Sequence, residues 1–383
     1  MTENTFISFI ESYKSFTIVP DSSLDSLISA GILLKNLSEH GWDVRVNLDP
    51  KVIVDYTDDP AVLLNLQPLN TQKQLALKTT STSSITALVV TILEKSTGGV
   101  SKWDKILAIF SGLYRGYYDF KGGGFRGIEN TILNELVSHK AITEVVGLRA
   151  WGAKRRSLIS ALTRTLIPFI PGITGNPENT SRVVKEVFKV TDPQSIRLKD
   201  VVSEEDIKKV SELVKRISEI TRNYVKKDLQ LQLKLVGDFY VQVEEYGVSL
   251  EFEAHEALGS LVAYESSCLD CLLDILMLPF SVDILSQTLV ACNSILDYLA
   301  VSLSTQIGEF LVTGKNIFEC DENLQRPDII VDILQYHNIL PENKPVVFLC
   351  NGEETAVLRE LLRVGVKTEE AYSKCTEKQL CRV

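Results

Sequence analysis

Residues 16–37 read FTIVPDSSLDSLISAGILLKNL, and this stretch predicts a buried strand, a polar turn and a helix in immediate succession. The strand is the apolar run 16–19. The helix is indicated by apolar residues that recur at helical spacing after the turn: Leu24, Leu27, Ile28 and Leu33. A strand, a turn and a helix in this order are typical of the start of an open α/β sheet.

The turn of this unit is where chemistry is expected, because open α/β sheets hold ligands at the carboxyl ends of their strands. Asp21 and Asp25 follow the first strand, near the start of the helix. One interpretation is that they form part of a metal site. The other, better for these two residues alone, is that aspartates favour the first helical turn through the helix dipole. Ser22 or Ser23 is expected to cap the helix by accepting a backbone hydrogen bond.

Strands and helices alternate over the first 136 residues, which predicts a doubly wound α/β domain whose parallel sheet is flanked by helices. Further strands are expected at 42–48, 51–56 and 61–66, helices at 83–95 and 128–136, and another apolar run at 106–110. Beyond residue 136 the chain turns helical, with helices expected at 157–166, 203–227, 254–276 and 282–312. The tail returns to α/β, with a strand at 346–350 and two amphipathic helices after it.

The length of 383 residues is enough for two domains that each bury a core. The apolar fraction of 45% and the charged fraction of 23% are those of ordinary soluble proteins. The sequence contains no uncharged apolar run of about eighteen residues, the length needed to cross a bilayer. The first residues lack the pattern of a secretion signal. Seven dispersed cysteines fit reduced thiols better than a disulfide framework. We therefore expect a cytoplasmic protein with no membrane partner.

The net charge of −10 argues against a protein that coats nucleic acid non-specifically, but the charge is unevenly spread. Residues 147–185 carry seven basic side chains and one acid, whereas residues 235–314 carry twelve acids and no Lys or Arg. Such an asymmetry often separates a face for a polyanion from a face for another partner. We expect the acidic block 235–314 to face protein partners, with four exposed acids on a strand-rich segment: Glu244, Glu245, Glu251 and Glu253.

The basic region contains the candidate contacts to single-stranded nucleic acid, which are Arg149, Lys154, Arg155, Arg156 and Arg164. Guanidinium groups clustered with a tryptophan, here Trp151, suit a phosphate backbone with occasional base stacking. A solvated positive helix start is an equally good interpretation of the same residues.

Motifs for catalysis or metal binding are weak. The four histidines stand apart, so no zincin or triad spacing can be drawn. Cys268 and Cys271 lie on one face of a predicted helix, but no second pair follows at zinc-ligand spacing, and a buried pair is the better interpretation. The glycines at 122–124 lack the spacing of a phosphate loop and indicate a tight turn before a helix. We therefore predict no catalytic residue, no metal ligand and no cofactor.

A longer set of residues resembles the archaeal RecJ-like branch of the DHH phosphoesterase superfamily. Its most specific part is an interior segment with Gly147-Leu148-Arg149, Gly152, Arg156, Leu158, Ala161-Leu162 and PFIPGITGN at 168–176. Other parts keep the same order: Gln67-Pro68, FRGIEN at 125–130 and GVKTEEA at 365–371. The resemblance implies a DHH-type domain with a helical middle region at 1–278, followed by a smaller, truncated DHHA1-type α/β domain at 279–383.

The chain departs from this family at the metal-binding motifs. The ligands of the first motif, a histidine and two aspartates, correspond to Asp21, Ser23 and Asp25, so only the last is kept. Leu64-Asn65-Leu66 stands in place of the Asp-His-His motif, and Gly116 in place of the fourth-motif aspartate. The second-motif aspartate corresponds to Asp55. Hydrolysis with two metals needs several ligands around cations about 3.5–4 Å apart, which Asp25 and Asp55 cannot supply.

The resemblance therefore implies a catalytically inactive relative without nuclease activity of its own. The RecJ-derived helicase subunits, archaeal counterparts of cell division cycle protein forty-five, fit this description. That family works in the replicative helicase with the GINS complex and the MCM ring. The resemblance implies those partners, support of DNA unwinding and a chromosome-associated location. Two alternatives stay open: a metal-dependent single-strand exonuclease or phosphoesterase with rearranged ligands, and a GINS-bound repair factor.

Overall fold

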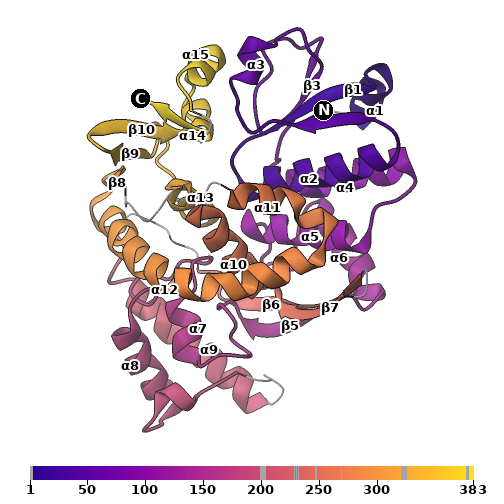
Figure 1. The fold of residues 1–383 in the computed structure, drawn as a ribbon. Coiled ribbons are helices and arrows are strands. Elements are labelled where there is room, and N and C mark those ends of the chain that lie inside the picture. Colours follow the sequence, from indigo (N-terminus) through magenta and orange to yellow (C-terminus); the bar gives the residue numbers. More distant parts are fainter. Residues whose placement is uncertain are drawn as a thin grey trace.

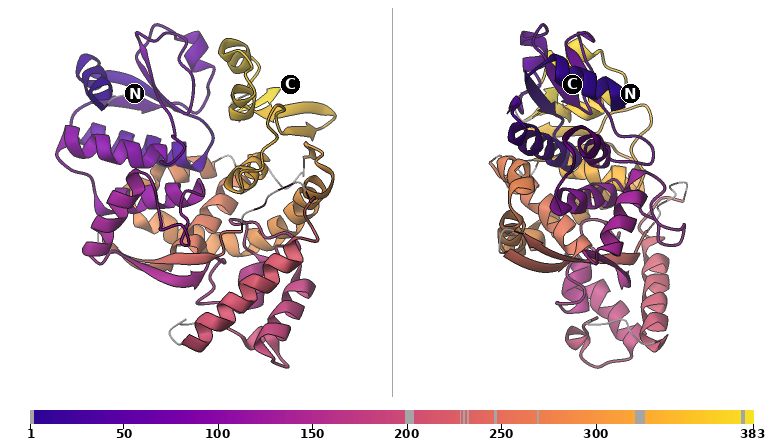
Figure 2. Two further views of the ribbon diagram at one scale, coloured as in Figure 1. Left: turned by 180° about the vertical axis from the view of Figure 1, so that it is seen from behind. Right: turned by 90° about the vertical axis from the view of Figure 1, so that its right-hand side faces the viewer.

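The structure is a computed structural model that describes residues 3–198, 204–227, 229, 231, 233–245, 248–268, 270–320, 326–376 and 379–383. A parallel sheet flanked by helices forms one end of the molecule, and a helical subdomain forms the other (Figure 1). A smaller mixed sheet built from the last part of the chain lies beside the parallel sheet (Figures 1 and 2). The predicted α/β class with a flanked parallel sheet is confirmed.

The parallel sheet has the strand order β2-β1-β3-β4. Its strands are β1 (Ser15–Pro20), β2 (Asp43–Val46), β3 (Ala61–Leu64) and β4 (Gln74–Leu77). The helices of this part are α1 (Glu3–Ser12), α2 (Leu24–Glu39), α3 (Val52–Asp55), α4 (Ile85–Thr97), α5 (Lys102–Tyr114) and α6 (Ile128–Ser138). Because β2 and β3 pair with opposite edges of β1, the carboxyl end of β1 is the topological switch point of the sheet.

Alternation along β1 divides the core into two parts. Phe16 and Ile18 join the main core, together with the apolar side chains of α2 and α4. Val19 points to the other face, where it packs with Ile53 of α3 and with Tyr372 from the C-terminal part of the chain. Since side chains in a strand alternate between the two faces of the sheet, β1 contributes to the cores on both faces.

The middle of the chain contains an antiparallel sheet and two groups of helices. The sheet has the order β5-β6-β7, with β5 (Ile142–Leu148), β6 (Val236–Glu245) and β7 (Val248–Glu253). The helical subdomain has a core of its own and comprises α7 (Leu158–Thr163), α8 (Pro177–Phe188), the 3₁₀ turn η1 (Pro193–Ser195) and α9 (Glu204–Thr221). The second group is α10 (Ala254–Ser267), α11 (Cys271–Met277), the 3₁₀ turn η2 (Leu278–Phe280) and α12 (Val282–Thr313).

The C-terminal part forms a mixed sheet with the order β11-β10-β9-β8, in which only the β8–β9 pair of the described strands is parallel. Its strands are β8 (Ile317–Glu319), β9 (Val347–Cys350), β10 (Glu353–Val357) and β11 (Leu380–Arg382). Its helices are α13 (Asp328–Tyr336), α14 (Leu358–Arg363) and α15 (Thr368–Ser373).

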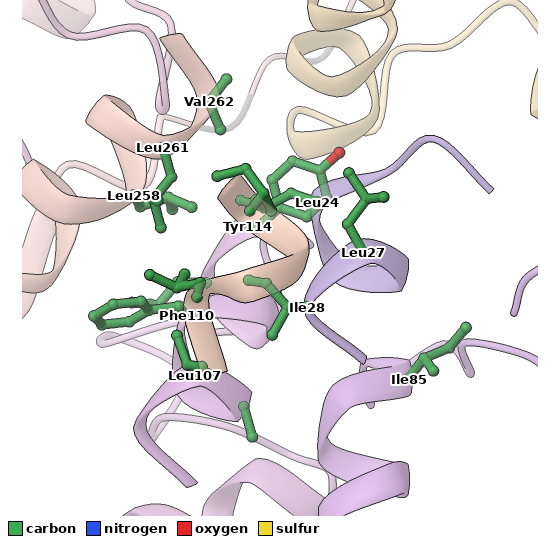
Figure 3. Close-up of a cluster of buried hydrophobic side chains, with 14 of the residues drawn as sticks. Leu24, Leu27, Ile28, Ile85, Leu107, Phe110, Tyr114, Leu258, Leu261 and Val262 are labelled. Carbon is green, nitrogen blue, oxygen red and sulfur yellow. The ribbon is translucent and has the colours of Figure 1, made fainter. Parts of the chain in front are cut away.

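The centre of the main core is where helices from distant parts of the sequence meet. Figure 3 shows Ile28 of α2, Phe110 of α5 and Leu258 of α10 within one cluster of buried side chains. All three side chains are fully buried. Helix α2 is thus held by a helix more than two hundred residues away, so the parallel sheet and α10 belong to one packed unit.

One described helix, α12, is long and apolar enough to cross a membrane, judged by length and composition alone. It packs along α10 and buries one side, which includes Leu285, Leu296 and Leu303. A core helix of a soluble protein passes the same test.

Several predicted elements change in the structure. The strand predicted at 51–56 is instead the short helix α3 with its two cap residues, because Asp49 accepts a hydrogen bond from the Lys51 amide and starts a helical turn after Pro50. The helix predicted at 254–276 divides into α10 and α11. Residues 106–110 lie within α5, and the helix predicted at 203–227 corresponds to α9, with Ser203 outside the described residues. The domain boundary at 278/279 stays a prediction.

The expectation of reduced, dispersed cysteines is wrong for six of the seven. The structure pairs them as three disulfides: Cys268–Cys271, Cys320–Cys350 and Cys375–Cys381. The remaining thiol, that of Cys292, is buried. Two of these pairs are close in the sequence, whereas the third joins Cys320, just after β8, to Cys350 of β9 and is brought together by the fold. The predicted buried pair at 268 and 271 is a bonded pair at the end of α10.

The close approach of α2 to α11 gives a test of this packing. A Cβ atom built on Gly31 would lie 2.0 Å from the carbonyl oxygen of Leu276, whereas one on Gly308 of α12 would meet nothing within 4 Å. We predict that Gly31→Ala lowers the free energy of unfolding by about 1–3 kcal/mol through overpacking. Gly308→Ala should raise it by up to about 1 kcal/mol through helix propensity. Urea denaturation of both variants measures this, and equal effects would contradict the packing.

Candidate functional site at the carboxyl end of the first strand

The turn after β1 is an internal polar network and not a helix cap of the expected kind. Ser23 is the N-cap residue of α2, but its hydroxyl accepts no backbone hydrogen bond there. Instead, the Ser23 hydroxyl and amide both donate to Asp21 Oδ1, at 2.5 and 3.1 Å. Both residues are buried. The expectation of a serine cap is therefore wrong, because the Ser23 hydroxyl donates to Asp21 and accepts from Arg115 Nη2 rather than from a backbone amide.

Asp25 lies in the first turn of α2 and has no solvent-exposed surface. Its Oδ1 accepts from the Thr86 amide at 3.1 Å and the Thr86 hydroxyl at 2.8 Å. Its Oδ2 accepts from the Ile85 amide at 3.2 Å and from Arg115 Nε at 2.9 Å. A carboxylate offers about four lone-pair sites. All of them are used, so Asp25 caps α4 and pairs with an arginine, and it has no lone pair left for a metal.

Arg115, at the end of α5, supplies the positive charge at this position. Its side chain is 4% exposed, and its Nη2 donates to the Ser23 hydroxyl at 3.1 Å. Burial is the largest single effect on Arg115 and lowers its pKa, but the negative charges around it, that of Asp25 first, together outweigh burial, so the pKa is raised above its usual value. The guanidinium therefore stays charged, and it neutralises Asp25 where a cation would otherwise be needed.

The positions that correspond to the other motifs of the family in the sequence resemblance also have structural roles. Leu64 and Leu66 are fully buried in the core. Asn65 adopts a left-handed conformation, with φ of 58°, and its side chain bonds Ser26 and the amide of Thr79. Gly116 has φ of 71°, and a Cβ there would lie 3.0 Å from the Tyr336 carbonyl oxygen. An aspartate at 116 would therefore strain the backbone and crowd its neighbour.

The C-terminal part of the chain closes the crevice at the sheet edge. Gln379 donates to the carbonyl oxygens of Pro20 and Leu48, at 2.9 and 3.1 Å, where β1 and β2 end. Arg326 donates to the carbonyl oxygen of Ser22 at 3.0 Å and to Glu265 at 2.7 Å. The space where an open α/β protein binds its ligand is thus occupied by the chain's own side chains.

This arrangement can hold the domains together, but it offers little for hydrolysis. Within the part of the chain that the structure describes, no three His, Cys, Asp or Glu side chains gather where they could hold a metal ion. Asp55 is exposed at the end of α3. Arg115, Arg326 and Gln379 are absent from the predicted site residues. The one sequence signal for them was Arg115 itself, a basic residue inside the apolar segment 103–118 and next to Gly116.

Two residues of the predicted nucleic-acid cluster are buried. Arg149 is 1% exposed and donates from Nε to the Gly237 carbonyl oxygen at 2.6 Å. Its guanidinium also lies 4.8 Å from the ring centre of Tyr118. Trp151 is 1% exposed and donates to the Ser260 hydroxyl at 2.9 Å. Neither side chain is accessible to a nucleic acid in this structure, so Arg149 ties strands together and Trp151 offers no face for base stacking.

The other four basic residues lie at the surface, and three of them pair with acids of the block 235–314. Arg155 donates to Glu256 at 2.5 Å, and Arg156 Nε lies 3.9 Å from the same carboxylate. Arg164 pairs with Asp297 at 2.5 Å. Lys154 lies 4.5 Å from the ring centre of Tyr240. The basic and acidic regions are thus partly complementary sides of one internal contact. Binding of nucleic acid by these four residues stays a prediction.

The four glutamates expected on an exposed strand divide in the structure. Glu244 and Glu251 are exposed, and the side chain of Glu245 lies outside the described residues. Glu253 is only 4% exposed, because it ends β7 and accepts a hydrogen bond from the Lys154 amide. Burial, and then the nearby charge of Asp238, raise the pKa of Glu253 to about 8.

Glu253 should make stability depend on pH. The folded protein keeps this proton up to about pH 8, whereas an unfolded chain releases it near the ordinary pKa of 4.5, so the free energy of unfolding falls as pH rises across this window. Between about pH 6 and about pH 8 we predict that the wild type loses about 2 kcal/mol more than Glu253→Gln. Exposed Glu244→Gln is the control. Urea denaturation at both pH values measures this, and parallel losses in all three proteins would contradict the buried proton.

Comparison with known proteins gives a structural match and no sequence match. No protein-family model matches the chain, and no curated protein does. The crystal structure of CDC45 from Entamoeba histolytica is similar, with a TM-score of 0.55 and 9% sequence identity over 92% of this chain and 84% of that one. At this identity the similarity concerns the fold alone. The chain has a CDC45-like α/β fold.

Proposed function

We propose that this protein is a catalytically inactive, RecJ-derived subunit of the replicative DNA helicase assembly, an archaeal counterpart of CDC45. In this proposal it binds the GINS complex and the MCM ring, supports DNA unwinding and contacts single-stranded DNA. It resides in the cytoplasm at the chromosome, takes no cofactor and has no nuclease activity of its own.

The observation that carries the proposal is the Asp25–Arg115 pair within a CDC45-like fold. The likeness spans nearly the whole chain, and the resemblance of the sequence to the RecJ-like family points in the same direction. The place of the metals is held by an arginine, which removes the means of hydrolysis while keeping the scaffold. Such a protein keeps the surfaces that bind partners and lacks hydrolytic activity, as is possible for a subunit that serves a structural role in an assembly.

The alternative of a working exonuclease gains nothing from the geometry, because the lone pairs of Asp25 are used. A GINS-bound repair factor shares every feature described, so replication and repair differ only in the partners bound. For the DNA contact, the four accessible candidates are Lys154, Arg155, Arg156 and Arg164.

The acidic strands β6 and β7 provide the test of the partners. We predict that the wild-type chain binds purified GINS and MCM from its own organism, and that Glu244→Lys with Glu251→Lys slows association several-fold at low salt. Exposed acids steer a basic partner and set the association rate more than the affinity, and salt screens them. Glu39→Lys with Glu212→Lys changes the same charge outside these strands and is the control.

Biolayer interferometry at several salt concentrations measures these rates, with circular dichroism to confirm folding. If the wild type binds neither GINS nor MCM, the proposed function is wrong. If it binds both and the two double variants behave alike, the function stands and the assignment of this face is wrong.

A further inference from the structure

The pair formed by Arg164 and Asp297 has the geometry of an oxyanion site. Arg164 follows α7, and its Nε and Nη2 donate to Asp297 Oδ1 and Oδ2, each at 2.5 Å. This is the two-pronged contact that a guanidinium makes with a carboxylate or with two oxygens of a phosphate. The Asp297 carboxylate, from the middle of α12, thus occupies a position that a backbone phosphate could fill.

Trp151 forms a rigid floor beneath this position. The guanidinium of Arg156 lies 3.9 Å from its ring centre and that of Arg164 lies 5.5 Å away. The ring is itself fixed, because it is buried and donates to Ser260. Two cations are therefore ordered before any anion arrives, which reduces the entropy that a bound phosphate would have to offset.

Burial decides which arginine of the cluster can exchange its partner. The side chain of Asp297 is 60% exposed, so it returns to water when it is displaced. The side chain of Glu256, which pairs with Arg155, is 3% exposed, and displacing it would leave a buried charge without a partner. Arg164 is thus the arginine that can release its carboxylate at small cost, while Arg155 stays bound.

We propose that Arg164, with Arg156 beside it, is a phosphate subsite for single-stranded nucleic acid, and that Asp297 occupies this subsite in the free protein. The strand binds by displacing the carboxylate, and no covalent bond changes. The proposal rests on the DNA contact within the proposed function and adds the residue that limits it. Asp297 sets the affinity and the salt dependence of that contact.

The test is a double-mutant cycle on binding of fluorescently labelled oligodeoxythymidylate, followed by anisotropy over a range of salt concentrations. We expect Asp297→Asn to bind about 1.4- to 5-fold more tightly than the wild type, the range for breaking an exposed ion pair. Its binding should also weaken more steeply with salt than that of the wild type, because salt screens the Arg164–Asp297 pair that competes with the strand only in the wild type. Arg164→Gln with Asp297→Asn should bind no more tightly than Arg164→Gln alone.

Asp283→Asn is the matched control, because Asp283 is an exposed acid of the same helix whose recorded partners are Ser281 and Gln287 rather than a cation. Equal tightening by Asp297→Asn and Asp283→Asn would overturn the proposal, since net charge alone would explain it. A gain that persists with Arg164→Gln would overturn it as well. If no folded variant binds the oligonucleotide even at low salt, the subsite does not exist, while association with GINS and MCM still decides the proposed function separately.

Discussion

The ion pair between Asp25 and Arg115 is the contact on which the first half of the molecule depends. Asp25 belongs to α2, accepts from the first amides of α4 and binds the arginine that ends α5, so one carboxylate joins three helices at the end of β1. Removing the arginine would leave a fully buried charge, which costs about 3–5 kcal/mol. A buried carboxylate at this position therefore requires a cation beside it, and Arg115 is that cation.

A cation within the chain changes what the crevice can do. A metal site needs open coordination positions, whereas a guanidinium fills its place with directed hydrogen bonds. The C-terminal part closes over this edge of the sheet through Gln379 and Arg326. The same principle recurs at the surface, where Arg155 and Arg164 bind carboxylates of α10 and α12. Charges that look separate in the sequence are matched in the fold.

Periodicity predicted the strand-turn-helix at 16–37, which the structure places at 15–39, and the α/β class, because apolar spacing reports directly which side of an element is buried. It failed at α3, where Pro50 starts a helical turn in a β-branched run. The candidate site was half predictable. Asp25 was identified as the surviving family aspartate, but its partner Arg115 is 90 residues away and pairs with it only through tertiary folding. The burial of Arg149 and Glu253 could not be predicted either, because the pattern of charges along the sequence does not show which charged side chains are buried.

The unfolding midpoint of the wild-type chain, measured with and without Mn²⁺, tests most directly whether Arg115 takes the place of a metal ion beside Asp25. We predict the same midpoint in both conditions, because Asp25 has no free lone pair and Arg115 already neutralises it. A metal site would respond differently, since a ligand at about 100 times its Kd adds about 2.7 kcal/mol to the free energy of unfolding. A midpoint that rises with Mn²⁺ in the wild type, but not in Asp25→Asn, would contradict the replacement.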